Sequence, residues 1–272
     1  MNSFILNLSL VVMCVFIVSC NKETEKKTPI DTDISLASDI HRLEEESLRA
    51  FYFLEHIEQY NKVPSSTFPA CASITFDTIA NKKVIIDFGN GCKCDAIDGK
   101  FRKGKLEIEW TGNYYEPNGK RNIKSNNYFV GNGSKYYQFS IDMTVTTNSY
   151  LQFSSTENIT FHKSNVDKIS RTSTKTYQWV KGKNTYNELY DDIFQVHGNG
   201  SGKGIDNKNF TTSTNQNEAI VLDMGCKWLK DGIFYLDPEN KNQRKVDYSV
   251  CDSYANVTIQ GRVYSINFLT LE

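Results

Sequence analysis

The fold is decided by the stretch Gln138-Phe-Ser-Ile-Asp-Met-Thr-Val145, in which polar and apolar side chains alternate strictly. Successive side chains of a β-strand point to opposite faces of its sheet, so this alternation predicts a strand with one buried and one solvated face. Strands of this kind are typical of antiparallel sheets, in which one face packs on a core and the other contacts water.

The same period of two continues outward from this stretch. Residues 106–111 alternate in the same way, with Leu106, Ile108 and Trp110 on one face. Further strand candidates are residues 158–162, 169–180, 192–197, 219–223, 257–260 and 262–271, with turns at 118–119, 131–133 and 198–204. We therefore predict a mainly β domain over residues 68–272, either an antiparallel β-sandwich or an open, twisted, barrel-like sheet.

One helix is predicted, over residues 38–62. Apolar side chains recur there near helical spacing, while the glutamates lie mostly off this stripe, as in an amphipathic helix. The apolar positions are Ile40, Leu43, Phe51, Leu54 and Ile57, and the acidic ones are Glu44, Glu45, Glu46, Glu55 and Glu58. Ser38 or Asp39 can cap the start, and Pro64 prevents the helix from continuing. No second long helical pattern appears in the sequence, which disfavours a parallel sheet.

The N-terminus resembles a bacterial lipoprotein signal. Residues 4–18 are almost continuously apolar and end in Ile17-Val18-Ser19-Cys20, which is similar to the lipobox that directs diacylglycerol onto a cysteine thiol. We predict that residues 1–19 are removed, that Cys20 carries the lipid, and that residues 20–37 form a flexible tether. The domain would then be anchored to a membrane of the cell envelope, with the outer membrane as the expected one, and exposed to the periplasm or the cell surface.

Two features depart from this signal pattern. Neither Lys nor Arg lies between Met1 and Ser19. Cys14 is a competing cysteine, although Val11-Val12-Met13 places a bulky residue where a lipobox has a small one. An uncleaved membrane anchor and an ordinary secretory signal are the alternatives.

Five further cysteines follow, and export would place them where disulfides persist. Cys71 and Cys92 flank one predicted β-hairpin, and Cys226 and Cys251 flank another. Because strand pairing brings the open ends of a hairpin together, we predict the disulfides Cys71–Cys92 and Cys226–Cys251. Cys94 is left as a free or alternately paired thiol, and a metal site at Cys92 and Cys94 is disfavoured because no nearby histidine completes it.

The two hairpins open two similar segments, residues 71–112 and 226–270. In each, a cysteine-flanked hairpin is followed by a glycine and a β pattern, at Gly104 and at Gly261. A duplicated sheet-building unit is the simplest interpretation, and chance similarity among short strands is the alternative.

Several short motifs point to one family. They are Asp87-Phe-Gly-Asn-Gly-Cys92, Asp98-Gly-Lys-Phe-Arg-Lys-Gly-Lys105, Thr111-Gly-Asn-Tyr114, Tyr128-Phe-Val130, Asp191-Asp192, Val246-Asp-Tyr248 and Cys251-Asp252. Together they resemble a family of β-rich membrane lipoproteins from Bacteroidota (Bacteroidetes) that has no assigned activity. The resemblance spans most of the chain after Ala37 and implies a lipid anchor and a β-rich domain. Ser249-Val250, in place of a glycine-rich turn, and the additional Cys94 depart from the family pattern.

The sequence contains no motif to which we assign a catalytic, metal-binding or cofactor-binding role. Three aspartates lie close to glycines: Asp87, Asp95 and Asp98. Their spacing does not match a calcium-binding loop, so we interpret them as turn residues. A solvated loop before a strand explains the basic run better than a phosphate or acidic-glycan site; its members are Lys100, Arg102, Lys103 and Lys105. Residues 198–204 are one residue short of a phosphate loop, and no helical pattern follows them.

The functional prediction is therefore coarse. A net charge of −1 with interspersed signs disfavours nucleic acid as a partner. We expect a non-enzymatic envelope protein with a binding or structural role, whose partner is a glycan or an envelope protein. One alternative is a lipid or lipoprotein carrier, which requires a large apolar cavity between helix and sheet. The other is a glycan-cleaving enzyme, which requires paired carboxylates in a cleft. Tyr114-Tyr115 and Tyr136-Tyr137 are candidate sugar-stacking platforms, with packing on the core as the favoured interpretation.

Overall fold

The structure is a computed structural model that describes residues 30–60, 68–77, 82–185 and 188–267. The predicted signal segment 1–19, Cys20 and the first part of the tether lie outside the described residues, as do the predicted helix residues 61–62, Pro64 and residues 268–272. Among the residues described, no helix combines the length and the apolar character that crossing a membrane requires.

The described residues form one antiparallel sheet of fifteen strands and one α-helix, α1 (Ser35–Tyr60). The strands are β1 (Ser73–Asp77), β2 (Lys83–Asp87), β3 (Cys92–Lys93), β4 (Phe101–Thr111), β5 (Lys120–Gly131), β6 (Tyr136–Ser149), β7 (Gln152–His162), β8 (Lys168–Lys181), β9 (Ile193–Lys203), β10 (Asn209–Thr214), β11 (Ile220–Asp223), β12 (Gly232–Pro238), β13 (Arg244–Tyr248), β14 (Tyr254–Ile259) and β15 (Arg262–Asn267). Their order is β1-β2-β4-β5-β6-β7-β8-β9-β10-β12-β13-β14-β15, with β3 on β4 and β11 on β9. The mainly β class with one N-terminal helix is confirmed, in its open-sheet form.

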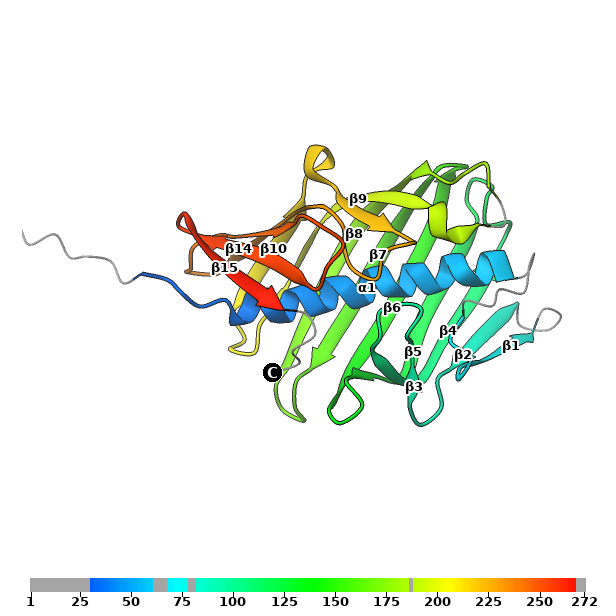
Figure 1. The fold of residues 1–272 in the computed structure, drawn as a ribbon, viewed down its shortest axis with the longest axis horizontal. Helices are drawn as coiled ribbons and strands as arrows, with labels where there is room; N and C mark the ends of the chain where they lie inside the picture. Colours follow the sequence, from blue (N-terminus) through cyan, green and yellow to red (C-terminus); the bar gives the residue numbers. More distant parts are fainter. Residues whose placement is uncertain (1–29, 61–67, 78–81, 186–187, 268–272) are drawn as a thin grey trace, which may run out of the picture. The chain divides into compact units, whose positions relative to one another are not determined.

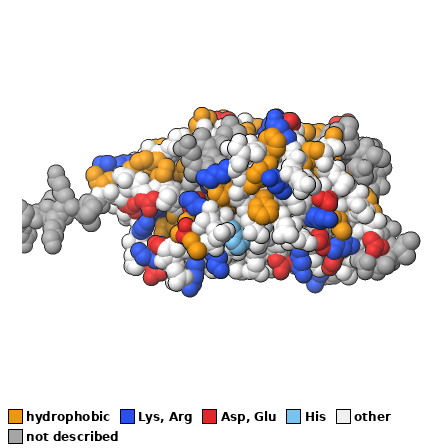
Figure 2. Space-filling model, turned by 90° about the horizontal axis from the view of Figure 1, so that it is seen from below, with side chains coloured by type: hydrophobic (Ala, Val, Ile, Leu, Met, Phe, Trp, Pro, Cys, Tyr) orange, Lys and Arg blue, Asp and Glu red, His pale blue; other side chains and the backbone are white. Residues whose placement is uncertain are grey.

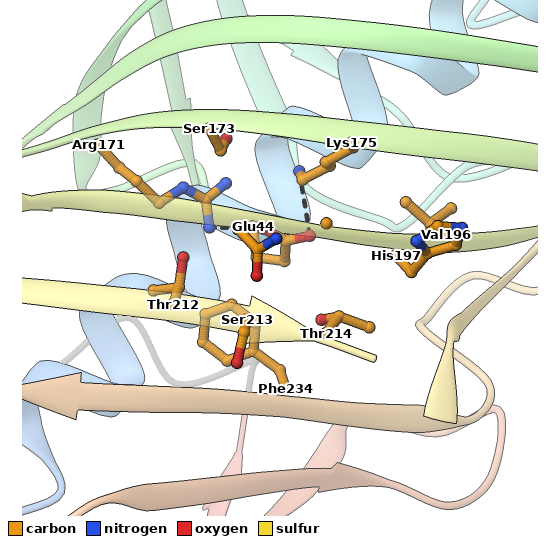
Figure 3. A pocket seen from close by; sticks show the side chains of 12 residues that line it. Glu44, Arg171, Ser173, Lys175, Val196, His197, Thr212, Ser213, Thr214 and Phe234 are labelled. Atoms are coloured by element: carbon orange, nitrogen blue, oxygen red, sulfur yellow. Dashed lines mark ion pairs between the residues drawn. The ribbon is translucent and has the colours of Figure 1, made fainter. Parts of the chain in front are cut away.

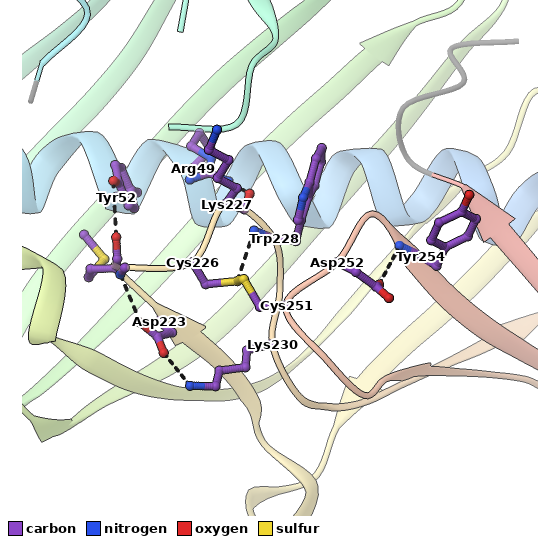
Figure 4. Close-up of a disulfide and its surroundings, with 12 residues drawn as sticks. Arg49, Tyr52, Asp223, Cys226, Lys227, Trp228, Lys230, Cys251, Asp252 and Tyr254 are labelled. Carbon is purple, nitrogen blue, oxygen red and sulfur yellow. Dashed lines mark hydrogen bonds and ion pairs between the residues drawn. A yellow bond between two sulfur atoms is a disulfide. The ribbon is translucent and has the colours of Figure 1, made fainter. Parts of the chain in front are cut away.

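The sheet curves around α1, which lies across its concave side (Figure 1). The helix contacts strands from different parts of the sheet. Glu44 pairs with Arg171 of β8, and His41 lies 2.7 Å from the hydroxyl of Tyr248 in β13. The segment after β11 covers the helix as well. There the carbonyl oxygens of Met224 and Lys227 accept hydrogen bonds from Tyr52 and Arg49 (Figure 4).

The start of α1 corrects the predicted tether boundary. The helix begins at Ser35, three residues before the predicted start, because Asp33 accepts hydrogen bonds from the backbone and the hydroxyl of Ser35. Asp31 forms an ion pair of 2.7 Å with Arg244 of β13, and Ala37 is fully buried. Residues 31–37 therefore belong to the folded domain and are not part of a flexible tether.

The polar face of the predicted amphipathic helix α1 does not lie in water. Every residue from position 43 to position 57 is buried, the glutamates included. An amphipathic helix leaves its polar face in water, but here the sheet and the covering segment enclose both faces. Buried ionised carboxylates require partners of opposite charge, which Arg171 of β8, Lys100 before β4 and Arg102 of β4 supply for Glu44, Glu45 and Glu46.

The alternation at residues 138–145 is confirmed in β6. Phe139, Ile141, Met143 and Val145 are buried against the core. The opposite face carries short polar side chains in cross-strand rows, such as Thr144, Thr156, Thr174 and Asn199 on β6 to β9. Threonine suits this position because β-branched side chains pack well on a pleated surface.

Residues 198–204 were predicted as a turn, but most of them belong to β9. This part of β9 pairs with both β8 and β10. Glycine is needed for close packing, since a Cβ at Gly202 would lie 2.0 Å from the carbonyl oxygen of Ser170 and 2.6 Å from the ring of Phe210. The glycines that suggested a turn therefore mark close approach of backbones within a sheet.

The structure joins Cys71 to Cys92 and Cys226 to Cys251, the two pairs predicted from the sequence. Their Cα atoms are 5.3 and 5.9 Å apart, within the range of disulfides. Cys94 is a buried free thiol, and burial raises its pKa.

The proposed repeat matches only in part. A cysteine-flanked hairpin occurs in both segments, as β1–β2 and as β12–β13. In the first segment, β4, which follows Cys92 and contains Gly104, pairs with β2. In the second segment, β14 pairs with β13, and the strand after Gly261 is β15 on the far side of β14. The strands aligned in the sequence therefore do not occupy equivalent positions.

Candidate functional site

Three consecutive glutamates of α1 each meet different cations, which lie in the sheet or directly before one of its strands. Successive helix residues are rotated by about 100°, so Glu44, Glu45 and Glu46 point in three directions. The carboxylate of Glu44 lies 2.5 Å from Arg171 and 3.0 Å from Lys175, both in β8. Glu45 lies 2.5 Å from Lys100, and Glu46 lies 3.3 Å from Arg102. Ion pairs therefore hold the helix to the sheet from several sides.

Figure 3 shows the group around Glu44. Glu157 of β7 completes it, because its carboxylate accepts hydrogen bonds from Ser47 and from Lys175. Burial alone would raise the pKa of Glu44, but the adjacent Lys175 and Arg171 lower it to about 2. The pocket among these residues has a volume of about 10 Å³, the size of one water molecule, so it offers no room for a ligand.

A second buried group surrounds Arg102 of β4. Its guanidinium donates two hydrogen bonds to Asp98, at 2.8 and 2.6 Å, and one to the hydroxyl of Tyr128 at 2.8 Å. Burial would raise the pKa of Asp98, but Arg102 lowers it to about 2. The prediction of a solvated basic loop is therefore wrong for Arg102, which is 0% exposed, and for Lys100, because buried carboxylates require both.

These groups have a structural role. Besides the ion pairs, aromatic rings fill the space between α1 and the sheet, with Phe51 stacked on Tyr177 at 4.0 Å between centroids. Within the part of the chain that the structure describes, side chains thus fill the space between α1 and strands β7 and β8. A lipid carrier needs an apolar cavity in this region.

Toward its C-terminal end, α1 carries a carboxyl group that forms no ion pair with any residue that the structure describes. Glu55 is 0% exposed and accepts a hydrogen bond from the hydroxyl of Tyr114. Burial raises the pKa of Glu55 to about 8, against the opposing effect of the Tyr114 hydrogen bond. The side chain is therefore mostly protonated at pH 7 in the folded state. In the unfolded state, with its ordinary pKa of 4.5, it is ionised at this pH.

Glu55→Gln is expected to stabilise the domain increasingly as the pH rises. Between the unfolded pKa of about 4.5 and the folded pKa of about 8, the folded state holds a proton that the unfolded state has lost, so wild-type stability falls with pH across this window. Glutamine does not titrate and removes this fall. Thermal unfolding at pH 4.5, 6 and 8 should show a growing gap in Tm, whereas the exposed control Glu109→Gln should show none. A gap that stays constant with pH would contradict the prediction.

An open cleft lies next to Glu55. Its volume is about 230 Å³, and its lining comes from the end of α1, the end of β4, the following loop and the start of β5. The lining residues are Ile57, Glu58, Ile108, Trp110, Gly112, Asn113, Tyr114, Tyr115 and Arg121. Glu58 and Arg121 form an ion pair at its wall, and the guanidinium of Arg121 lies 5.0 Å from the centroid of Tyr114. We call this the distal cleft.

Aromatic side chains surround the distal cleft. The ring of Tyr115 lies 6.2 Å from Tyr150 and 6.3 Å from Trp179, which connect the cleft to the β6–β7 turn and to β8. Trp110 and Tyr115 are half-buried, and Tyr150 is 40% exposed. The indole nitrogen of Trp179 donates to Asp192 at 3.1 Å, which holds this ring in place.

The two predicted tyrosine platforms have different outcomes. Both Tyr114 and Tyr115 line the distal cleft, but Tyr114 is buried and stacks on Phe153 at 4.9 Å. Tyr137 packs on Phe161 in the core, and the ring of Tyr136 lies under the ammonium of Lys103 at 3.6 Å. Tyr115 is therefore a half-buried cleft residue. Tyr114 and Tyr137 pack on the core, as the favoured interpretation predicts.

Sequence reasoning missed the polar part of the cleft. In the sequence, Glu58 belongs to the acidic positions of the helix and Trp110 to the apolar face of a strand, and no pattern distinguishes Arg121. Trp110 and Arg121 are cross-strand partners in the consecutive strands β4 and β5, but Glu58 lies in α1, far from both in the chain, so no short motif indicates all three.

Neither surface charge nor comparison with known proteins identifies a ligand for the distal cleft. On the face shown in Figure 2, basic and acidic side chains are interspersed and form no patch of a single sign. Within the described residues, no group of three or more His, Cys, Asp or Glu side chains is arranged to hold a metal ion. Comparison with family models, with curated proteins and with solved structures finds no match. The resemblance to Bacteroidota lipoproteins therefore stays a prediction.

Proposed function

We propose that this chain is an exported, lipid-anchored protein of the cell envelope, and that its β domain has a non-enzymatic binding role. The observation that supports the binding role best is the distal cleft, an aromatic-lined recess with one ion pair at its wall. It lies at the C-terminal end of α1, whose 26 residues span about 39 Å. The predicted tether precedes the start of α1, and the cleft lies at the other end of this helix.

Export is supported by the cysteines. Disulfides persist in oxidising compartments and are rare in the cytosol. Cys71–Cys92 and Cys226–Cys251 close loops with sequence separations of 21 and 25 residues at two separate parts of the sheet. Two such bridges agree with the signal segment that we predict at residues 1–19.

A binding role is better supported than hydrolysis of a glycan. Glycosidases use two carboxyl groups about 5 to 10 Å apart on either side of the bond that breaks. Among the described residues that line the distal cleft, Glu58 is the one carboxylate, and Arg121 neutralises it. Glu55 carries a proton at pH 7 but is 0% exposed behind Tyr114, so a substrate in the cleft does not reach it.

Cys20→Ala is expected to abolish metabolic labelling with palmitate and to release the protein from the membrane fraction. Each buried methylene of an acyl chain contributes about 0.8 kcal/mol, so loss of the acyl chains removes the anchor. Labelling of the full chain, followed by fractionation of the cells, measures both effects.

Cys14→Ala is the matched control, since it removes the other cysteine of the N-terminal segment. This variant should keep both the label and the membrane association. Unchanged labelling of Cys20→Ala would overturn the proposed anchor.

A further inference from the structure

We infer that the distal cleft binds a neutral oligosaccharide by stacking a sugar ring on Trp110 and Tyr115. This inference rests on the proposed binding role and names the ligand class. It is argued from the aromatic lining, the ion pair at the wall, the charge and the size of the cleft.

The aromatic lining suits the apolar face of a sugar ring. A pyranose presents C–H bonds on its faces and hydroxyl groups around its edge. The face of an aromatic ring carries a partial negative charge and attracts such C–H groups. Trp110 and Tyr115 line the cleft and are only half-buried, so part of each ring faces the open space. Tyr150, 40% exposed and 6.2 Å from Tyr115, extends the aromatic surface beyond the cleft.

The polar groups suit the hydroxyl edge of the same ring. Arg121 donates hydrogen bonds to Glu58 and to the carbonyl oxygens of Gly112 and Lys120, at 3.4 and 2.9 Å for the two carbonyls. These contacts hold the Glu58–Arg121 pair in one orientation. A sugar hydroxyl both donates and accepts hydrogen bonds, so it can donate to the carboxylate of Glu58 while accepting from another donor. Asn113, which also lines the cleft, donates one amide N–H to Glu116 at 3.2 Å, and its second N–H suits a sugar hydroxyl in the same way.

The charge of the cleft favours a neutral ligand. Its lining contains one carboxylate and one guanidinium, which pair with each other. An anionic ligand would compete with Glu58 for Arg121, and a cation would compete with Arg121 for Glu58. Phosphate groups and acidic sugars therefore meet no unpaired positive charge among the lining residues, which disfavours nucleic acids and acidic glycans.

The size of the cleft favours a short part of a longer chain. Pockets that enclose drug-sized ligands have volumes of about 300–1,000 Å³. The distal cleft has about 230 Å³ and opens to solvent. It therefore accommodates one or two rings, with the rest of an oligosaccharide lying over the exposed Tyr150.

The test uses the full chain purified in detergent, titrated with neutral pentasaccharides of glucose, N-acetylglucosamine, xylose and mannose. Tryptophan fluorescence reports binding, because a sugar stacked on Trp110 shields its indole from the quencher acrylamide. We expect at least one of these sugars to bind saturably and to reduce quenching. Penta-galacturonate, as the acidic probe, and a neutral pentapeptide should have no such effect.

Trp110→Ala and Tyr115→Ala should each raise the Kd about tenfold or more, since each removes one stacking ring. Trp110→Phe keeps an aromatic ring, so it should retain most of the affinity, measured by calorimetry, while losing the fluorescence change. Trp228→Phe is the matched control. Trp228 follows Cys226 in the segment that crosses α1 (Figure 4) and does not line the cleft. The Kd and the sugar-dependent change in quenching should therefore stay unchanged. Circular dichroism identifies any variant that fails to fold. In that case Glu58→Gln, which removes the carboxylate that accepts from a sugar hydroxyl, should also raise the Kd.

Failure of all four sugars to bind the folded wild-type chain would overturn the inference, and so would equal affinity in wild type and in Trp110→Ala. Saturable binding of the peptide instead would overturn the ligand class but leave the binding role standing. None of these measurements depends on acylation of Cys20, so their failure is distinguishable from failure of the anchor.

Discussion

Arg102→Met is expected to lower the free energy of unfolding by about 3–5 kcal/mol. Arg102 is 0% exposed and donates three hydrogen bonds of 2.6 to 2.8 Å, two to Asp98 and one to Tyr128. Methionine has a similar length but no charge, so Asp98 would lose its bidentate partner and stay buried. Glu46, 3.3 Å from the guanidinium, would lose a partner as well. Urea unfolding of the full chain at pH 7 measures the loss.

A matched control is Lys93→Met. Lys93 pairs with Asp95 at 2.7 Å, but both side chains are more than half exposed. Exposed pairs of this kind contribute about 0 to 1 kcal/mol, so this variant should unfold close to wild type. If Arg102→Met unfolded as close to wild type as Lys93→Met does, the buried ion pairs would not hold helix and sheet together.

The loss from Arg102→Met should also depend on pH. In the wild type, Arg102 lowers the pKa of Asp98 from 3.8 to about 2, against the effect of burial. The stability contributed by this ionised carboxylate is present above the unfolded pKa and is lost as the pH falls toward the folded pKa. The difference between wild type and Arg102→Met should therefore be largest above about pH 4 and shrink toward pH 2.

Phe51→Ala is expected to cost about 3–5 kcal/mol, because the surrounding rings cannot close the cavity it leaves. Phe51 is fully buried in α1, stacks on Tyr177 at 4.0 Å and meets Phe194 edge-on at 5.2 Å. Both partners belong to long strands, β8 and β9, whose backbone ladders limit their movement. Thermal or urea unfolding measures the loss.

Phe129→Ala is the control for this substitution. Phe129 lies half-buried in β5, between the inward-facing Tyr128 and Val130, and so points to the opposite face of the sheet. Its removal should cost clearly less than that of Phe51. Equal losses from the two variants would contradict the central position that we assign to Phe51.

The strand pattern was predictable because it depends on local chemistry. The alternation at Phe139, Ile141, Met143 and Val145 follows from the pleat of a single strand and needs no knowledge of its neighbours. The two disulfides were predictable for a related reason, since the open ends of a hairpin are close in space whenever the hairpin forms. The turn predicted at residues 198–204 failed because Gly202 serves the packing of neighbouring strands.

The burial of the α1 glutamates was not predictable in this way. Glu44, Glu45 and Glu46 look like a solvated face until Arg171, Lys100 and Arg102 are known to lie opposite them. Each of those partners lies 55 or more residues beyond its glutamate in the chain. Hydrophobic periodicity identifies a helix, but it does not show whether a charged side chain faces water or an opposite charge.

By itself, the sequence determined a mainly β antiparallel domain with one N-terminal helix, and the two cysteine pairs that close its hairpins. These properties follow from side-chain periodicity and from contacts between neighbouring strands. Only the tertiary structure decided that the sheet curves around a buried, charged helix and that Glu58, Trp110 and Arg121 meet in one cleft. The physical reason is that ion pairs and clefts depend on distances between elements, and those distances exist only when the whole sheet has assembled.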